Sequence, residues 1–365
     1  MITMNAFTLE PESLVRAQLA AMERVLRSGW YVLGREVQTF ETEWAQASGA
    51  KHAVGVGNGL DAIEIGLRVC GVGPGDEVVT TAMTAFATTL AILRAGATPV
   101  FADIDPATAL LDPASAERCI TQRTKAILLV HLYGQLGDMD AWQALCKRRR
   151  ILLIEDCAQS HLALWRGRAG GTFGACGAYS FYPTKNLGAL GDGGALVTMD
   201  NAHAELAKRL RNYGQSQRYH HPDIGLNSRL DELQAAILRV RLAVLPEFTA
   251  RRRAIGAQYL AGIRNPRVEL LAAPAAPESH VYHLFVVRCT ERDRLAEHLK
   301  SGGIESLCHY PVPVHRQPPC KDMARDAQGM AHTERHAAQC LSLPCHPQLS
   351  DDNVAKVISA VNAFQ

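Results

Sequence analysis

The sequence of 365 residues lacks any apolar run that approaches the roughly 20 residues of a membrane-spanning helix. Apolar residues make up 47% and charged residues 20% of the chain, which is typical of a soluble globular protein. The first ten residues have neither a basic start nor an apolar stretch that ends in small residues. We therefore expect no secretory signal, no membrane partner and a cytoplasmic location.

No Cys-x-x-Cys pair occurs among the ten cysteines. Cys340 and Cys345 lie near His346, but without the spacing of a closed zinc site. We expect buried, reduced thiols and no metal site.

A strong net charge is also absent, since the formal value is only +2. The basic cluster Lys147–Arg150 ends a predicted helix, where cations interact favourably with the helix dipole. There is no basic face and no pair of DNA-binding helices, so we expect no nucleic-acid partner.

The first two thirds of the chain alternate short apolar strands with helical stretches. Helices are predicted over Glu12–Ser28, with Leu14, Leu19, Met22 and Leu26 at helical spacing, and over Glu36–Ala47. The predicted strands are Val78–Thr81, Thr98–Ala102, Ala126–His131, Ile151–Glu155, Ala178–Phe181 and Ala195–Met199. This alternation predicts a largely parallel sheet covered by helices, with ligands at the carboxyl ends of the strands.

A change of pattern follows a long predicted helix over Asp231–Ile263. The remaining predicted elements are the strands Val281–Arg288 and Ile304–His309 and the helices Arg292–Ser301 and Asn353–Phe364. We therefore expect a large domain over residues 1–240 and a small α/β domain over residues 241–365.

A glycine-rich turn, Gly57–Asp61, directly precedes a predicted helix over Ala62–Cys70. Free N–H groups and the positive helix end converge there and would bind a phosphate. An ordinary tight turn with Asp61 as the helix cap is the alternative.

The apolar strand Ile151–Glu155 is followed by Asp156, so two adjacent acids, Glu155 and Asp156, point to opposite faces. One carboxylate beneath a heterocycle can keep its ring nitrogen protonated. The alternative is a carboxylate that caps the following turn.

Lys185 lies in a segment of small and apolar residues, Ser180–Gly194, and meets no acidic neighbour before Asp192. Such surroundings lower the pKa of an ammonium group and favour the neutral amine that carbonyl chemistry requires. A solvated loop lysine is the alternative.

These motifs, together with Asn227–Leu238 and His309–His315, resemble in order and spacing the DegT-type sugar aminotransferases, a branch of the fold-type-I pyridoxal-phosphate enzymes. The resemblance covers nearly the full length. It implies an α/β fold with a large, mostly parallel sheet flanked by helices and a smaller α/β C-terminal domain.

The resemblance implies pyridoxal 5'-phosphate as the cofactor, cycling with its pyridoxamine form. Lys185 would be the catalytic Schiff-base lysine, Asp156 the partner of the pyridine nitrogen and Gln159 a neighbour of the ring hydroxyl. The remaining cofactor contacts would be Ser180, Gly59 and Leu60 at the phosphate and Phe86 stacked on the ring. For Phe86 alone, a core aromatic is an equal alternative.

Asn227 corresponds to an asparagine that reaches the phosphate of the neighbouring subunit in the family. It implies a homodimer whose active sites are shared across the interface. A position near a helix N-terminus would explain Asn227 equally well, and both roles are compatible.

The residues expected at the substrate are His309, Tyr310 and His315 of the proline-braced loop, with Tyr182 and Tyr219. For His315 a structural role in the turn is the alternative. Both tyrosines are placed by position only.

The stretches Gly57–Ala62 and Asn186–Gly194 resemble those of enzymes that aminate C3 of dTDP-linked 3-keto-6-deoxyhexoses. We therefore expect transfer from an amino acid, L-glutamate, to C3 of such a nucleotide sugar. Alternatives are a 4-keto sugar substrate, a dehydratase with histidine in place of Lys185, or a non-catalytic regulator of the same fold. One departure from the family is Leu162, where relatives commonly carry glycine.

Overall fold

The computed structural model describes residues 1–365 and is built around a seven-stranded sheet in the order β1-β9-β8-β5-β4-β2-β3. Its strands are β1 (His52–Val56), β2 (Glu77–Thr81), β3 (Thr98–Ala102), β4 (Thr124–Val130), β5 (Leu152–Asp156), β8 (Cys176–Ser180) and β9 (Gly194–Thr198). Neighbours from β3 through β8 pair in parallel, whereas β9 is antiparallel to both β8 and β1. The predicted, largely parallel sheet is confirmed.

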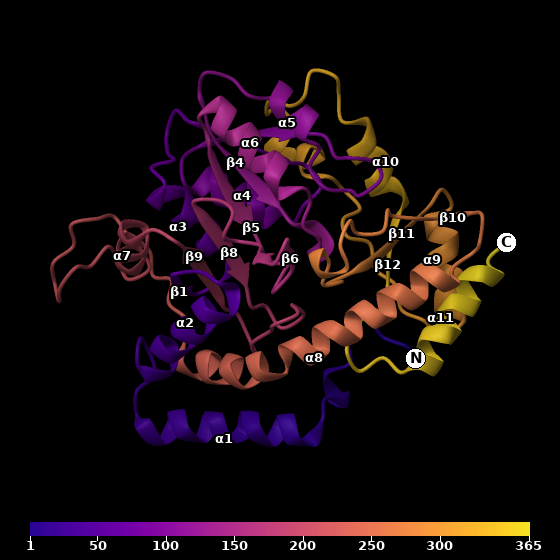
Figure 1. Cartoon of the computed structure of the whole chain (residues 1–365), viewed down its shortest axis with the longest axis horizontal. Coiled ribbons are helices and arrows are strands. Elements are labelled where there is room, and N and C mark those ends of the chain that lie inside the picture. Colours follow the sequence, from indigo (N-terminus) through magenta and orange to yellow (C-terminus); the bar gives the residue numbers. More distant parts are fainter.

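Helices cover both faces of this sheet (Figure 1). One face packs on α3 (Gly59–Val69), α4 (Phe86–Arg94) and α7 (Asn201–Leu210). The other packs on α2 (Arg35–Ser48), α5 (Pro113–Arg118), α6 (Met139–Arg149) and α8 (Glu232–Gly262). Because strand side chains alternate, Val54 and Val56 belong to the first core and Ala53 to the second. No helix is both long enough and apolar enough to cross a membrane.

The first helix, α1 (Glu12–Ser28), ends at Gly29, whose φ of 66° breaks the helix. Its predicted apolar face is only partly correct. Leu14 is buried, as expected, but Leu19 and Leu26 are exposed, because α1 packs on α8 through a stripe that includes Ala21 and Val25. Leu19 and Leu26 of α1 therefore face outward.

The C-terminal third holds a second sheet of β10 (Val268–Leu270), β11 (Phe285–Cys289) and β12 (Cys340–Leu343). It packs with α9 (Arg292–Ser301) and α11 (Asp351–Ala363), while α10 (Ala331–Gln339) leads into β12. The helix α8 contains Pro246 and runs from the large sheet to this smaller one (Figure 1). The proposed domain boundary at residue 240 falls inside α8 and stays a prediction.

One strand prediction in this region is too long, and another is wrong. The strand expected over Val281–Arg288 is the shorter β11, because Tyr282 has a φ of 44° that breaks the extended conformation. The strand expected over Ile304–His309 is reduced to single bridges. Ile304 pairs with Ile2 and Leu307 with Ser342, and two different partners prevent a continuous ladder.

The short elements are a two-stranded ribbon, β6 (Leu164–Trp165) and β7 (Arg168–Ala169), and five single turns of 3₁₀ helix. These turns are η1 (Phe7–Leu9), η2 (Leu132–Gly134), η3 (Pro277–Ser279), η4 (Val314–Arg316) and η5 (Pro318–Cys320).

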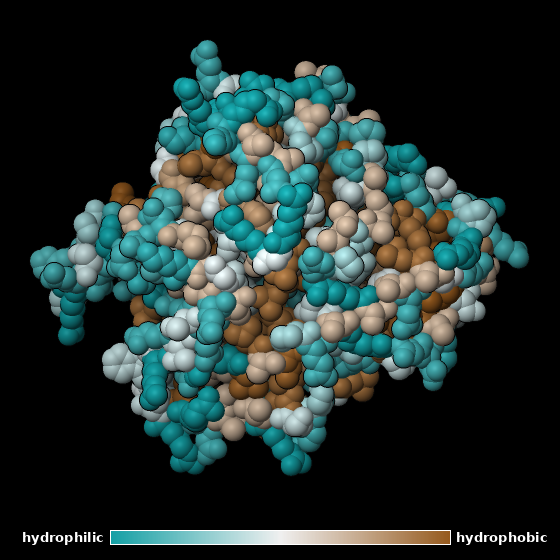
Figure 2. Space-filling view, viewed as in Figure 1, coloured by the Kyte–Doolittle hydropathy of each residue, from teal (hydrophilic) through white to brown (hydrophobic).

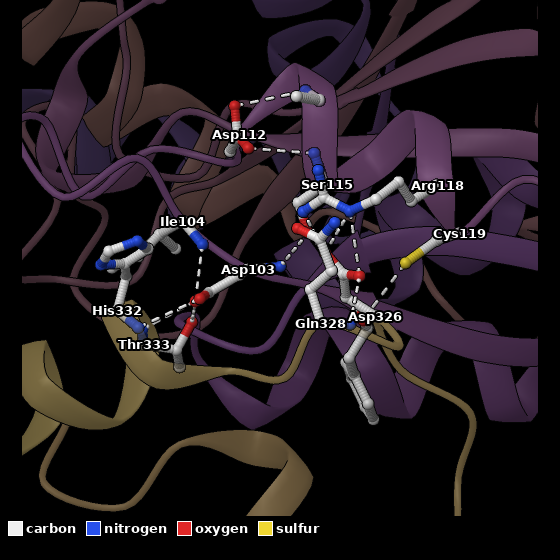
Figure 3. A network of polar contacts seen from close by, with 12 residues as sticks. Asp103, Ile104, Asp112, Ser115, Arg118, Cys119, Asp326, Gln328, His332 and Thr333 are labelled. Atoms are coloured by element: carbon white, nitrogen blue, oxygen red, sulfur yellow. Dashed lines mark hydrogen bonds and ion pairs between the residues drawn. The ribbon is translucent and has the colours of Figure 1, made fainter.

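A buried polar network joins the segment before α10 to the large sheet (Figure 3). Asp326 pairs with Arg118 and accepts from the Ser115 hydroxyl, and Arg118 holds the pKa of Asp326 at about 2. Asp103, after β3, accepts from the Thr333 N–H at 2.8 Å. Asp326 is thus held to α5 and Thr333 to the residue that follows β3.

Candidate active site

The candidate site lies at the carboxyl ends of β5 and β8, which are parallel neighbours. These strands end at Asp156 and Ser180. Two helix starts reach the same edge, because Gly59 of α3 lies against Ser180 and Thr88 of α4 contacts Asp156. This is the position expected for a ligand in an open α/β sheet.

Asp156 is a buried carboxylate with two hydrogen-bond donors. Its Oδ1 accepts from the Ala158 N–H at 3.1 Å and its Oδ2 from the Thr88 hydroxyl at 2.8 Å. Burial raises the pKa of Asp156, while Ala158, Thr88 and the nearby Lys185 act in the opposite direction. Such a carboxylate favours a further cationic N–H donor, which would offset its desolvation.

Lys185 is half-buried in the segment that follows β8. Burial lowers its pKa to about 8, against the opposing attraction of Asp156. The next residue, Asn186, donates from its amide to Val281 O at 3.0 Å, and its Oδ1 lies 3.3 Å from His283 Nδ1. The segment that carries Lys185 is therefore held in place by Val281 and His283, which come from the C-terminal third of the chain.

Glu155, the acid next to Asp156, has a different set of partners. Its carboxylate accepts from the N–H groups of Gly171, Phe173 and Gly174, each at 2.8 Å. His131 Nε2 lies 2.9 Å from its Oε2. Glu155 thus holds the loop after β7, while Asp156 serves the candidate site.

The N-terminus of α3 forms a tight cradle against the end of β8. Asn58 caps the helix, because its Oδ1 accepts from the Asp61 N–H at 2.8 Å. The helix cap is therefore Asn58 and not Asp61. A Cβ on Gly59 would lie 2.6 Å from Ser180 Cβ, so only glycine allows this approach. The N–H groups of Gly59 and Leu60 open the helix and have no partner within it.

Gln159 is connected to the loop that carries Tyr310. Its amide donates to the Tyr310 hydroxyl at 3.4 Å, and its Oε1 accepts from the Tyr133 N–H. Burial, followed by the charge of Asp156, raises the pKa of Tyr310 to about 12. Tyr310 therefore lies close to Gln159 and Asp156.

Phe86 and His309 border this region. Phe86 is the first residue of α4 and is 36% exposed, so it is not the core aromatic of the alternative interpretation. Thr184, the residue before Lys185, lines a pocket together with His283 and His309. His309 Nδ1 lies 2.9 Å from Ser342 Oγ, and burial lowers the pKa of His309 to about 4.

The side chains of four predicted residues form no hydrogen bond with this group, although the backbone N–H of Tyr182 donates to Ser180 Oγ at 3.4 Å. His315 is buried, and its Nε2 lies 3.1 Å from Glu334 Oε1 on α10. Tyr182 is 53% exposed, and Tyr219 is 79% exposed. Asn227 is also exposed, at the base of the loop that follows α7 and projects from the body (Figure 1).

Sequence reasoning gave no role to three side chains of the site. Thr88 binds Asp156, and its only sequence signal was a hydroxyl two residues after Phe86. His161 Nε2 donates to Ser180 O at 2.9 Å, and burial lowers the pKa of His161 to about 3. His283 approaches Asn186 from a distant segment and had no detectable signal.

Leu162 occupies a turn with a φ of 60°, the left-handed conformation that favours glycine. This leucine therefore adopts a conformation that glycine takes more readily, at a strain of about 1 kcal/mol.

These residues fit pyridoxal phosphate. The amine of Lys185 has a lowered pKa. Asp156 is a desolvated carboxylate that can accept a further hydrogen bond from a ring N–H. The cradle at Gly59 offers free N–H groups to a phosphate, with the Ser180 hydroxyl beside them.

The chain matches the DegT/DnrJ/EryC1/StrS aminotransferase family over residues 12–362. A "dTDP-3-amino-3,4,6-trideoxy-alpha-D-glucose transaminase" of Streptomyces venezuelae is 47% identical over 345 residues, which is 94% of this chain and 91% of the relative. A "pleiotropic regulatory protein" of Geobacillus stearothermophilus is 42% identical over 355 residues, 97% of this chain and 95% of the relative.

A solved structure is also very similar. It is S. venezuelae DesV "in complex with ketimine intermediate", with a TM-score of 0.95 and 45% identity, over 99% of this chain and 97% of that one. The expected fold and aminotransferase class, with the pyridoxal-phosphate dependence of that class, are confirmed. The chain belongs to the DegT/DnrJ/EryC1/StrS aminotransferase family.

Proposed function

We propose that the chain transfers the amino group of an amino acid, L-glutamate, to C3 of a dTDP-linked 3-keto-6-deoxyhexose. The observation that carries the proposal is the pairing of Lys185, with its lowered pKa, and the buried Asp156 at one sheet edge. The loops Gly57–Ala62 and Asn186–Gly194 support C3 as the aminated position. The S. venezuelae relative, which is named as a transaminase of a 3-amino sugar, supports the same position.

Bound pyridoxal phosphate supplies an electron sink at the reacting carbon. Asp156 would keep the proton on the ring nitrogen, and Gln159 would bind the ring hydroxyl. The N–H groups of Gly59 and Leu60 and the hydroxyl of Ser180 would bind the phosphate. Phe86 would stack on the ring and exclude water from one face.

Lys185 Nζ would move the proton in both half-reactions. It takes a proton from Cα of the amino-acid donor, which leaves as its 2-oxo acid, and later delivers one to C3 of the sugar. Proton removal needs a neutral amine, and a pKa of about 8 leaves roughly a tenth of the lysine neutral at pH 7.

We assign the sugar nucleotide to the pocket beside Lys185. His309 lines this pocket, and the next residue, Tyr310, accepts a hydrogen bond from Gln159 at 3.4 Å. Tyr182, which is exposed two residues beyond β8, would contact the substrate from the opposite side. His315 would act indirectly, through Glu334 and the proline-braced loop.

The active form would be a homodimer with sites shared between subunits. Asn227 and Tyr219 are exposed on the projecting loop, where they would reach the partner's site (Figure 1). Leu19 and Leu26 of α1 are 59% and 57% exposed. Hydrophobic surface gathers in the lower part of this face, where α1 and α8 lie (Figure 2). The cytoplasmic location stays a prediction.

A second candidate function is suggested by the G. stearothermophilus relative, which is named as a regulatory protein. A non-catalytic regulator has no need for a lysine of lowered pKa near the buried Asp156, so we favour the enzyme. A 4-keto sugar remains the alternative substrate.

The test is to incubate the pyridoxal-phosphate-loaded protein with L-glutamate and a dTDP-3-keto-6-deoxyhexose and to identify the product by mass spectrometry. The 3-amino sugar is expected, and Lys185→Ala should form none. Turnover of only the 4-keto isomer would refute C3 amination. Failure of the wild type to develop a visible cofactor band on reconstitution would refute the enzyme assignment.

A further inference from the structure

A second cluster of reactive side chains lies at the far end of β8, away from Ser180. Cys176 is the first residue of β8, Cys70 caps the C-terminus of α3, and His203 lies in the first turn of α7. Cys176 Sγ is 3.8 Å from Cys70 Sγ and 3.9 Å from His203 Nδ1. All three ligand atoms lie within 4.8 Å of one another.

These separations suit a zinc ion. Zinc binds thiolates at about 2.3 Å and imidazoles at about 2.0–2.1 Å, so ligand atoms of a tetrahedral site lie roughly 3.5–3.8 Å apart. The cluster therefore needs shifts of only a few tenths of an ångström at the pairs measured. Two sulfurs and one nitrogen are also ligands that favour zinc over the hard cations magnesium and calcium.

Access and neighbouring charge support the same occupant. Cys176 is buried, whereas Cys70 and His203 are half-buried, so an ion can approach from solvent, and water would supply the fourth ligand. The Asp200 carboxylate accepts from the His203 N–H at 3.0 Å and so fixes the turn that carries the imidazole. It also adds negative charge close to Cys176.

We propose that Cys70, Cys176 and His203 bind one zinc ion that joins α3, β8 and α7. The other ends of α3 and β8 carry Gly59 and Ser180, which form the cradle described above. The ion would lie about 13 Å from Ser180, the length of four strand residues. The ion stabilises the packing of α3 against β8 and takes no part in the reaction.

Sequence spacing could not reveal this site, because its ligands come from three separate segments. The expectation of no metal rested on the absence of a Cys-x-x-Cys pair and of the ligand spacing of a closed zinc site.

The test uses tag-free holoprotein, dialysed after exposure to zinc sulfate, with zinc measured by mass spectrometry of the metal. Wild type should retain about one zinc per chain and gain at least about 3 °C in melting temperature. Cobalt in place of zinc should give a sulfur-to-metal charge-transfer band. Both Cys176→Ser and His203→Ala should lose the band and the melting shift.

Cys308→Ser is the matched control, because Cys308 belongs to another close thiol pair, 3.5 Å from Cys340. It should bind zinc as the wild type does. Equal retention by wild type and His203→Ala, or no retention by the wild type, would overturn the proposal. If Cys176→Ser does not fold, the half-buried Cys70→Ser takes its place, and the cofactor band reports the fold of every variant.

Discussion

At Lys185 two electrostatic effects oppose each other. Burial removes solvation from the ammonium and lowers its pKa, whereas Asp156 attracts the charge and raises it. Burial prevails and leaves the pKa at about 8. The sequence indicated this direction, because small apolar neighbours cannot solvate an ammonium group.

The rate at which the cofactor-free protein takes up pyridoxal phosphate should follow this pKa. Only the neutral amine attacks an aldehyde, so the rate should rise about tenfold per pH unit below 8 and level off above 8. Rapid-mixing absorbance measures it. Asp156→Asn removes the attracting charge and should move the midpoint below pH 8. A midpoint near the ordinary lysine value would contradict the assignment.

Thr88 is a positioning residue for Asp156, and its removal should affect the reaction more than the fold. Thr88→Val preserves the shape but leaves Asp156 Oδ2 without its 2.8 Å donor. We expect kcat to fall about tenfold, the equivalent of one hydrogen bond to a charged group. Thr88→Ser, which keeps the hydroxyl, should restore most of the rate. Equal rates for the valine and serine variants would remove Thr88 from the site.

Single residues of the site were predictable only where a motif surrounded them. Lys185, Asp156 and Gly59 stand in recognisable contexts of strand ends and glycine turns. Thr88 and His283 do not, because their roles depend on side chains that the fold brings together from distant segments. A hydroxyl or an imidazole in isolation has too many possible partners for sequence reasoning to choose one.

At the scale of elements, the periodicity of apolar residues predicted the helices and strands whose pattern is strong within their own sequence. The ranges Glu12–Ser28, Thr98–Ala102 and Arg292–Ser301 are confirmed to the residue. The strands β1 and β12 had not been predicted. Their pairing partners lie far along the chain, so the information that makes them strands is not local.

The contact between α3 and β8 makes a prediction for the glycine at the helix start. In Gly59→Ala the new Cβ would meet Ser180 Cβ at 2.6 Å and push the helix away from the strand end. The N–H groups would move with it, so we expect pyridoxal-phosphate affinity to fall by about tenfold or more. Equilibrium titration of the cofactor band measures this loss.

Gly73→Ala is the control for that experiment. Gly73 lies shortly after α3, has no positive φ, and would place its Cβ 3.8 Å from Ala95 O, an ordinary contact. Its cofactor affinity should equal that of the wild type. Unchanged affinity in Gly59→Ala would show that the close approach of α3 to β8 is not needed for binding.

At the scale of the whole molecule, the projecting loop is the feature that a single chain leaves unexplained. It carries the exposed Tyr219 and ends near the exposed Asn227, while Lys185 is held within the body. The sequence implied a shared site through Asn227 alone. The structure adds the projecting loop and an exposed apolar face on α1, formed by Leu19 and Leu26, and both features suit a dimer.

Subunit complementation tests the shared site. A chain with Lys185→Ala and a chain with Asn227→Ala carry different tags, are co-expressed, and the mixed dimer is purified through both tags. If Asn227 serves the partner's site, one site of the mixed dimer carries both defects and the other carries none. The mixed dimer should therefore reach about half of the wild-type rate, because one of its two symmetric sites is intact.

The Lys185→Ala homodimer should be inactive. The Asn227→Ala homodimer, freed of excess cofactor, should be about tenfold slower than wild type because it lacks a hydrogen bond to the phosphate. A mixed dimer that is only as active as the average of the two homodimers would place Asn227 outside the partner's site.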